Sequence, residues 1–157
     1  MSLESENANE LFSQLATDLR RKLAQHAQLM TAAEGTSLID HTVLPDHLVI
    51  LNSGTVRVSV PCTRRTVSMT TGQVGKVFGM RAAISGELPE IDVTCLEPCN
   101  ITVVPRDAFL DLLRNHPEIY FAVAKVLSAD LQIADNILRS NSRRVSPSLR
   151  FKVPKSI

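Results

Sequence analysis

The chain has 157 residues, of which 44% are hydrophobic and 21% charged, and its formal net charge is +1. These values are typical of one globular domain, and they give the whole chain no electrostatic attraction to nucleic acid or anionic membranes. We expect no membrane span, because no run of about eighteen apolar residues occurs. Three cysteines without a CxxC pair favour a reducing, cytoplasmic location.

The first predicted element is an amphipathic helix over residues 9–27. Leucines recur at four-residue spacing, and two further apolar residues widen the stripe. These residues are Leu11, Leu15, Leu19 and Leu23, with Phe12 and Ala16 beside them.

Between residues 37 and 104 the pattern changes to short extended segments. Residues 55–60 alternate strictly, with Val56, Val58 and Val60 on one face. Weaker strand candidates are residues 36–39, 47–51, 66–70, 91–95 and 100–104, and turn-forming Gly, Asn and Pro residues separate them. Short strands at this spacing are typical of a β-sandwich or β-roll.

Two helices are predicted after the strands, over residues 106–115 and 117–141. The second is long, about 37 Å at 1.5 Å per residue. One apolar stripe on it has heptad spacing and comprises Ile119, Val123, Val126, Asp130, Ile133 and Ile137. A second stripe of Leu127, Leu131, Ala134 and Leu138 lies beside it. Either one stripe covers the domain's own strands while the other meets a partner helix, or the whole apolar arc packs on the protein's own core.

The predicted domain therefore spans residues 9–141. Residues 142–157 contain prolines, serines and basic residues without helical periodicity, which predicts a basic flexible tail or the stub of a linker.

Five segments in order resemble the sensor domain of the cyclic-AMP receptor protein/Fnr (Crp/Fnr) family. They are residues 11–20, 34–38 and 48–58, the Phe78-Gly79 cassette described next, and residues 104–109. The resemblance implies an α+β fold: a β-roll (double-stranded jelly roll) flanked by an N-terminal helix and a long C-terminal helix. It also implies a homodimer through the 117–141 helix, for which we predict the heptad stripe from Ile119 to Ile137 as the dimer seam. The resemblance further implies a non-enzymatic module that senses a small-molecule effector for transcription regulation.

In this family a cassette of the form Phe-Gly-Glu-hydrophobic-Ala/Gly-Leu, ending in Pro-Arg-x-Ala, binds the cyclic phosphate. The corresponding pocket residues are Phe78, Gly79, Met80, Arg81, Ala82, Ala83, Pro89, Glu90 and Asp92. Met80 stands at the Glu position, Glu90 at the Arg position and Asp92 at the Ala position. A carboxylate repels a phosphate, by about 4 kcal/mol at about 4 Å in a partly buried site. We therefore expect no binding of cyclic AMP in the usual way, although Arg81 could reach into the pocket.

The resemblance leaves other functions open. Some family members carry haem on a histidine, and this chain has His26, His41, His47 and His116. An iron–sulfur cluster on N-terminal cysteines is excluded, because residues 1–61 contain no cysteine. A ligand-independent dimeric interaction module is a further alternative.

The remaining candidate chemistry is weaker. Cys95 and Cys99 flank a Glu-Pro turn and are either a redox pair or, the interpretation we favour, small buried side chains. Glu90 and Asp92 could bind a cation or face solvent. No catalytic motif is present, so we expect no enzymatic activity and no resident metal or cofactor. The helix-turn-helix domain of the family regulators needs more than the sixteen residues after Asn141, so no autonomous DNA binding is expected.

Overall fold

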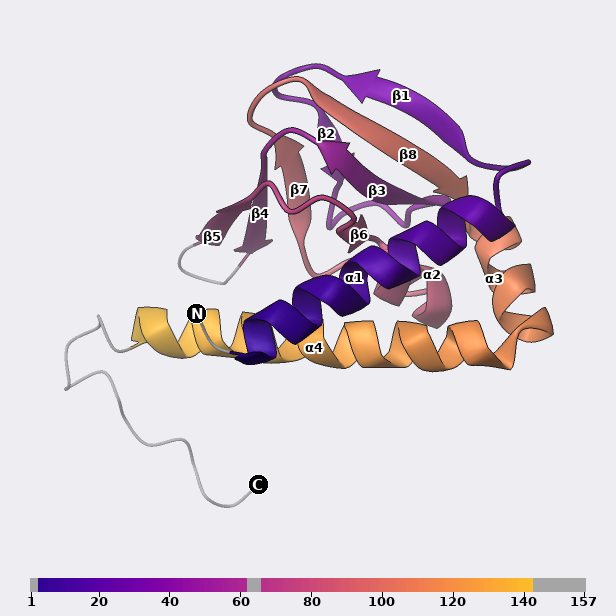
Figure 1. Cartoon of the computed structure of the whole chain (residues 1–157). Coiled ribbons are helices and arrows are strands. Elements are labelled where there is room, and N and C mark those ends of the chain that lie inside the picture. The colour runs from indigo at the N-terminus through magenta and orange to yellow at the C-terminus, as the bar shows by residue number, and fades with distance from the viewer. Residues whose placement is uncertain (1–2, 62–65, 143–157) are drawn as a thin grey trace.

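The computed structural model describes residues 3–61 and 66–142, with side chains described over 13–61 and 66–129. The helices are α1 (Leu3–Lys22), α2 (Met80–Ser85), α3 (Arg106–Asn115) and α4 (Pro117–Ser142) (Figure 1). The strands are β1 (Gln28–Ala32), β2 (Ser37–Ile39), β3 (His47–Ser53), β4 (Val56–Pro61), β5 (Thr66–Thr71), β6 (Val77–Phe78), β7 (Asp92–Cys95) and β8 (Cys99–Pro105).

Two four-stranded antiparallel sheets form the β-roll. One has the order β1-β8-β3-β6 and the other β2-β7-β4-β5. In Figure 1 the helices α1 and α4 run side by side beneath the roll, and the two helices are in contact. The α+β class and the β-roll flanked by an N-terminal and a long C-terminal helix are therefore confirmed.

Both faces of strand β3 are buried, so this strand lies between two apolar cores. Leu48 and Ile50 belong to an apolar cluster on the helical side, whereas Val49 and Leu51 belong to a second cluster between the two sheets. Successive side chains of a strand point to opposite faces. A continuous apolar run thus serves two cores at once.

The helical core contains the inner faces of all four helices. Leu15 and Leu19 of α1, Phe109 of α3 and the first turns of α4 are buried there together. A polar link also ties α1 to the roll: Arg20 donates to the Asn52 side-chain oxygen at 2.7 Å. The Asn52 amide donates in turn to the hydroxyl of buried Thr102 at 2.8 Å, so this polar group has a partner inside the fold.

The structure corrects the predicted dimer stripe over its first half. Ile119, Val123 and Val126 are all buried within the single chain, in the helical core. They cannot also face a partner helix, because α4 turns this stripe toward α1 and the roll. Asp130, Ile133 and Ile137 continue the stripe within α4, but their side chains lie outside the described part. The predicted tail from residue 143 onward also lies outside it.

The boundaries of α1 differ from the prediction as well. The helix ends at Lys22, and residues 28–32, which carried no strand prediction, form β1. Four of the five residues of β1 are exposed, so the strand has no alternating apolar pattern.

Two phenylalanines test the assignment of the core. Phe109 is fully buried and Phe121 is 71% exposed. We expect Phe109→Ala to lower the free energy of unfolding by about 3–5 kcal/mol, because it leaves a cavity. The matched control Phe121→Ala should change it by less than about 0.5 kcal/mol. Urea unfolding followed by circular dichroism measures both, and equal losses would contradict the packing described.

Candidate functional site

The predicted cassette lies between β6 and β7 and is built around Gly79. This residue adopts φ 95°, in the left-handed region, and precedes α2. A Cβ at this position would lie 3.3 Å from Ile39 Cδ1 and 3.4 Å from the His47 carbonyl oxygen. Only glycine therefore combines this backbone conformation with this close approach.

The turn at Gly79 sends its two neighbours into different cores. Phe78 is buried between the sheets, and Met80 is buried in the helical core with 2% of its surface exposed. Ala82 and Ala83 of α2 are also buried. The apolar members of the predicted pocket are thus buried side chains, and Phe78 and Met80 belong to different cores.

The C-terminal end of α2 is held from another element. Gly86 adopts φ 74° and donates its backbone N–H to the Ala82 carbonyl at 2.9 Å. Arg106, the first residue of α3, donates from Nε to the Ala83 carbonyl at 2.9 Å. Sequence reasoning missed this contact, because no local pattern links residues 23 positions apart.

The charged members of the cassette form an ion pair on its surface. Arg81 Nη1 lies 2.8 Å from Glu90 Oε2, and the two side chains are 58% and 69% exposed. The half-buried Pro89 immediately precedes Glu90. The structure therefore brings Arg81 and Glu90 together, whereas Met80 lies in the interior.

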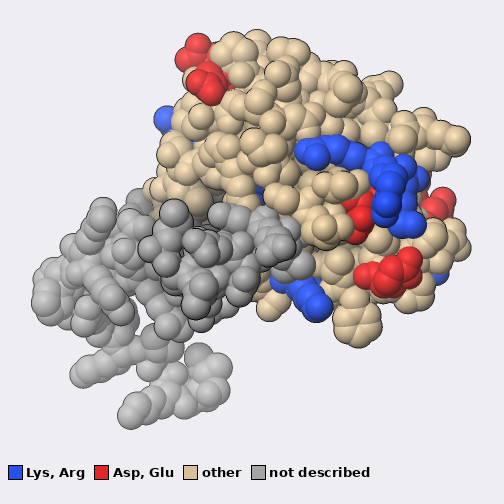
Figure 2. All heavy atoms as spheres, viewed as in Figure 1, with Lys and Arg blue, Asp and Glu red and all other residues tan. Residues whose placement is uncertain are grey.

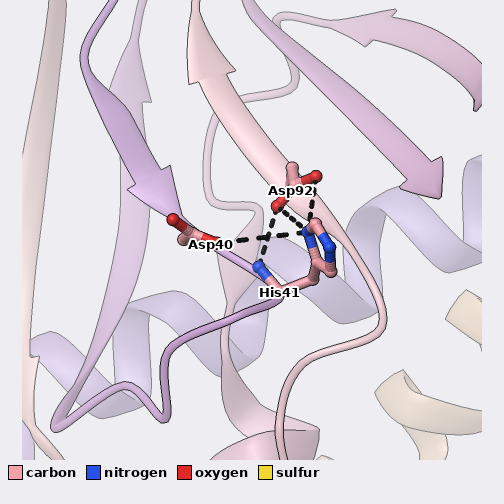
Figure 3. Close-up of side chains that lie close together, drawn as sticks. All are labelled: Asp40, His41 and Asp92. Atoms are coloured by element: carbon pink, nitrogen blue, oxygen red, sulfur yellow. Dashed lines mark hydrogen bonds and ion pairs between the residues drawn. The ribbon is translucent and has the colours of Figure 1, made fainter.

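Asp92 does not join this ion pair. It contacts His41, which lies two residues after the end of β2 (Figure 3). His41 Nδ1 lies 2.8 Å and 2.9 Å from the two Asp92 carboxylate oxygens. The His41 backbone N–H also donates to Asp92 Oδ1 at 2.8 Å. Asp40 lies beside them, with Oδ1 4.0 Å from His41 Nδ1. Sequence reasoning missed this cluster, because His41 and Asp92 are 51 positions apart.

The carboxylate of Asp40 is fixed by the following residue. Its Oδ1 accepts from the Thr42 backbone N–H at 2.8 Å and from the Thr42 hydroxyl at 2.7 Å. These two hydrogen bonds hold the pKa of Asp40 below its usual value, and the one from the Thr42 backbone has the larger effect.

Two of the other histidines each contact a single carboxylate. His47 Nδ1 lies 2.7 Å from Asp46, and His116 Nδ1 lies 3.1 Å from Glu118. His26 is exposed. Each of the two pairs joins near neighbours in the chain, and these positions give the haem alternative no support.

A surface groove of about 410 Å³ lies between the end of α1 and α3. Its charged lining residues are of both signs and include Lys22, Asp107 and Asp111. Figure 2 shows blue and red side chains side by side in this region, where the last turn of α1 is basic. The lining of the groove is therefore neither uniformly positive nor uniformly negative. No residue of the cassette lines it.

Comparison with known proteins identifies the family. A family model described as "Cyclic nucleotide-binding domain" matches residues 29–116, which is more than half of the chain. The chain belongs to this family. None of the curated proteins matches the sequence.

Solved structures with the same fold include regulators and single domains. The Catabolite Activator Protein of Thermus thermophilus is 21% identical, with a TM-score of 0.67; the match covers 84% of this chain and 62% of that protein. A cyclic nucleotide-binding domain from Methylobacillus flagellatus is 20% identical, with a TM-score of 0.62 and coverage of 98% and 89%. A cAMP-binding acyltransferase from Mycobacterium smegmatis is 22% identical, with a TM-score of 0.57 and coverage of 74% and 40%. At these identities the likeness is one of fold. Among the described helices, none has the length and apolar character to cross a membrane.

The two described cysteines allow a test of the roll's interior. Cys95 and Cys99 are free and buried, and burial raises the pKa of Cys95 to about 11. The Cys95 thiol should stay protonated at pH 8 and therefore unreactive, because the thiolate is the nucleophile. Burial keeps the reagent away from Cys99 as well. In a Cys62→Ser variant we expect iodoacetamide to modify neither residue in the native state and both in denaturant. Mass spectrometry of the quenched samples measures this, and rapid native labelling would contradict it.

Proposed function

We propose that the chain is the regulatory, non-enzymatic sensing module of a Crp/Fnr-type transcription regulator, and that its cassette does not bind cyclic AMP in the family's usual way. The observation that carries the proposal is the ion pair between Arg81 and Glu90. In this pair the Glu90 carboxylate neutralises the charge of Arg81. Glu90 stands at the position where the family has its phosphate-binding arginine.

The magnitude of this effect follows from exposure. Glu90 is 69% exposed, so solvent screens its charge. Its repulsion of a phosphate is therefore closer to about 1 kcal/mol, the value in water, than to about 4 kcal/mol in a partly buried site. The ion pair itself contributes about 0–1 kcal/mol, since exposed pairs are weak. The proposed loss of cyclic AMP binding thus depends on the missing arginine–phosphate attraction as much as on the repulsion between Glu90 and the phosphate.

Burial of Met80 supports the same conclusion. The family's glutamate at this position accepts a hydrogen bond from the ribose hydroxyl, and a thioether in the helical core cannot do so. Introducing a glutamate at position 80 would bury a carboxylate in the helical core, which is costly. Position 90 is therefore the better place to restore ligand binding.

We expect the wild-type chain to bind cyclic AMP too weakly to reach saturation in calorimetry. Glu90→Gln should improve affinity by about fivefold, by removing about 1 kcal/mol of repulsion, and Glu90→Arg by about thirtyfold, by adding a similar attraction. Glu87→Gln is the matched control, because it removes a nearby exposed carboxylate outside the ion pair. Tight, saturable binding by the wild-type protein would overturn the proposal. Absence of binding in all variants would favour the ligand-independent interaction module.

The helical core supports a route from the cassette to α4. Met80 and Ala83 of α2 belong to the same apolar cluster as Val123 and Val126, and the two helices are in contact. A displacement of α2 by an effector would have to repack these side chains. The module would then transmit the presence of an effector as a shift of α4.

We further propose a homodimer through the outer face of α4. Tyr120 is 52% exposed, and it lies one heptad before Leu127 in the second apolar stripe. Leu127 is half-buried and packs against the helical core, so the exposed Tyr120 marks the face of α4 that we propose for a partner. The first half of the heptad stripe, up to Val126, packs in the protein's own core.

Two aspartate substitutions distinguish the stripes. Tyr120→Asp should shift a dimer to monomer and leave the fold intact, because it places a charge on an exposed surface. Val126→Asp should unfold the chain, because it buries a charge in the helical core. Light scattering measures mass and thermal unfolding measures stability. A wild-type chain that is monomeric at high micromolar concentration would contradict the dimer.

A further inference from the structure

The cluster of Asp40, His41 and Asp92 lies where two paired strands of one sheet end. In the register of β2 and β7, Ile39 is paired with Val93. Asp40 and His41 follow Ile39, and Asp92 precedes Val93, so backbone pairing alone places the three residues together. The sheet brings the three residues together, and their side chains lie close to one another (Figure 3).

From this geometry we propose that Asp40, His41 and Asp92 form a binding site for a divalent transition-metal ion of the zinc class. One ligand atom from each residue lies within 4.8 Å of the other two. His41 Nδ1 is 2.8 Å from Asp92 Oδ1 and 4.0 Å from Asp40 Oδ1. A tetrahedral zinc ion bound at about 2.0–2.1 Å holds its ligand atoms about 3.3 Å apart. The two distances bracket this value, so small side-chain rotations open the site to the ion.

The donor set selects the class of metal. One imidazole and two carboxylates suit zinc, cobalt and related ions, whereas Mg²⁺ and Ca²⁺ prefer oxygen ligands alone. Three protein ligands leave a coordination position for water, which can reach the site. The side chains of Asp40, His41 and Asp92 are 49%, 42% and 30% exposed.

Hydrogen bonds outside the ligand set keep the carboxylates in place. The backbone N–H of His41 donates to Asp92, and the backbone N–H and hydroxyl of Thr42 donate to Asp40. Partners of this kind orient metal ligands and reduce the rearrangement needed on binding. The bound ion would join the ends of β2 and β7.

The other described histidines with carboxylate partners show why this cluster stands apart. His47 and His116 each contact one carboxylate, from a residue one or two positions away in the chain. His41 has two carboxylates within 4.0 Å, one of them from another strand. The site uses no residue of α2 and does not depend on the proposed function.

The test is a titration of the chelator-treated full chain, carrying Cys62→Ser, with Zn²⁺ by calorimetry and with Co²⁺ by visible absorption. We expect one ion per chain with micromolar affinity and no response to Mg²⁺. Because the site contains no thiolate, the Co²⁺ complex should lack intense thiolate charge-transfer absorption. Zn²⁺ should also raise the temperature of thermal unfolding.

The variants His41→Gln and Asp92→Asn should each weaken Zn²⁺ binding by at least about tenfold. His47→Gln is the matched control and should leave the affinity unchanged, because it removes a histidine with a single carboxylate partner. Circular dichroism of the metal-free proteins checks that each variant is folded. A wild-type chain that binds no Zn²⁺, or a His47→Gln variant weakened as much as His41→Gln, would overturn the proposal.

Discussion

The structure depends on the packing of four helices against one face of β3. Leu48 and Ile50 form the floor of this helical core, and α1, α2, α3 and α4 all contribute buried side chains to it. The dense packing of protein interiors means that no member can move without displacing a neighbour. The cassette helix α2 has only six residues and is therefore positioned by this core and by the hydrogen bond from Arg106, more than by its own helical hydrogen bonds.

Much of the fold follows from apolar periodicity. Alternation in residues 55–60 predicts β4, and four-residue spacing of leucines predicts α1. The prediction fails where the side chains carry no pattern: β1 is exposed at four of its five positions, and β6 has only two residues. The heptad stripe of α4 was assigned to a partner because spacing defines a face of a helix but not what covers it. Only the path of the chain shows that Ile119, Val123 and Val126 face inward.

Part of the candidate site could be predicted, because it is a local sequence motif. Phe78 and Gly79 form a local motif, and the backbone conformation of Gly79 agrees with its role in the turn. The contacts of Arg106 with α2 and of His41 with Asp92 join residues 23 and 51 positions apart. The contact of His41 follows from the register of β2 and β7, and that of Arg106 from the packing of α3 against α2. The sequence of one chain reveals neither. The partner of Arg81 was missed too, because Glu90 lies nine positions further along the chain, beyond the end of α2.

The two acidic residues of the cassette have different consequences for ligand recognition. Glu90 and Asp92 are two positions apart, yet Glu90 contacts Arg81 and Asp92 contacts His41. Each carboxylate has its own basic partner, so their charges do not add into one field over the cassette. An anion that approaches α2 would meet a neutralised pair, whereas a cation that approaches the end of β2 would meet two carboxylates and one imidazole. The proposed change in the charge recognised at this edge of the β-roll therefore depends on a few side chains and not on the fold.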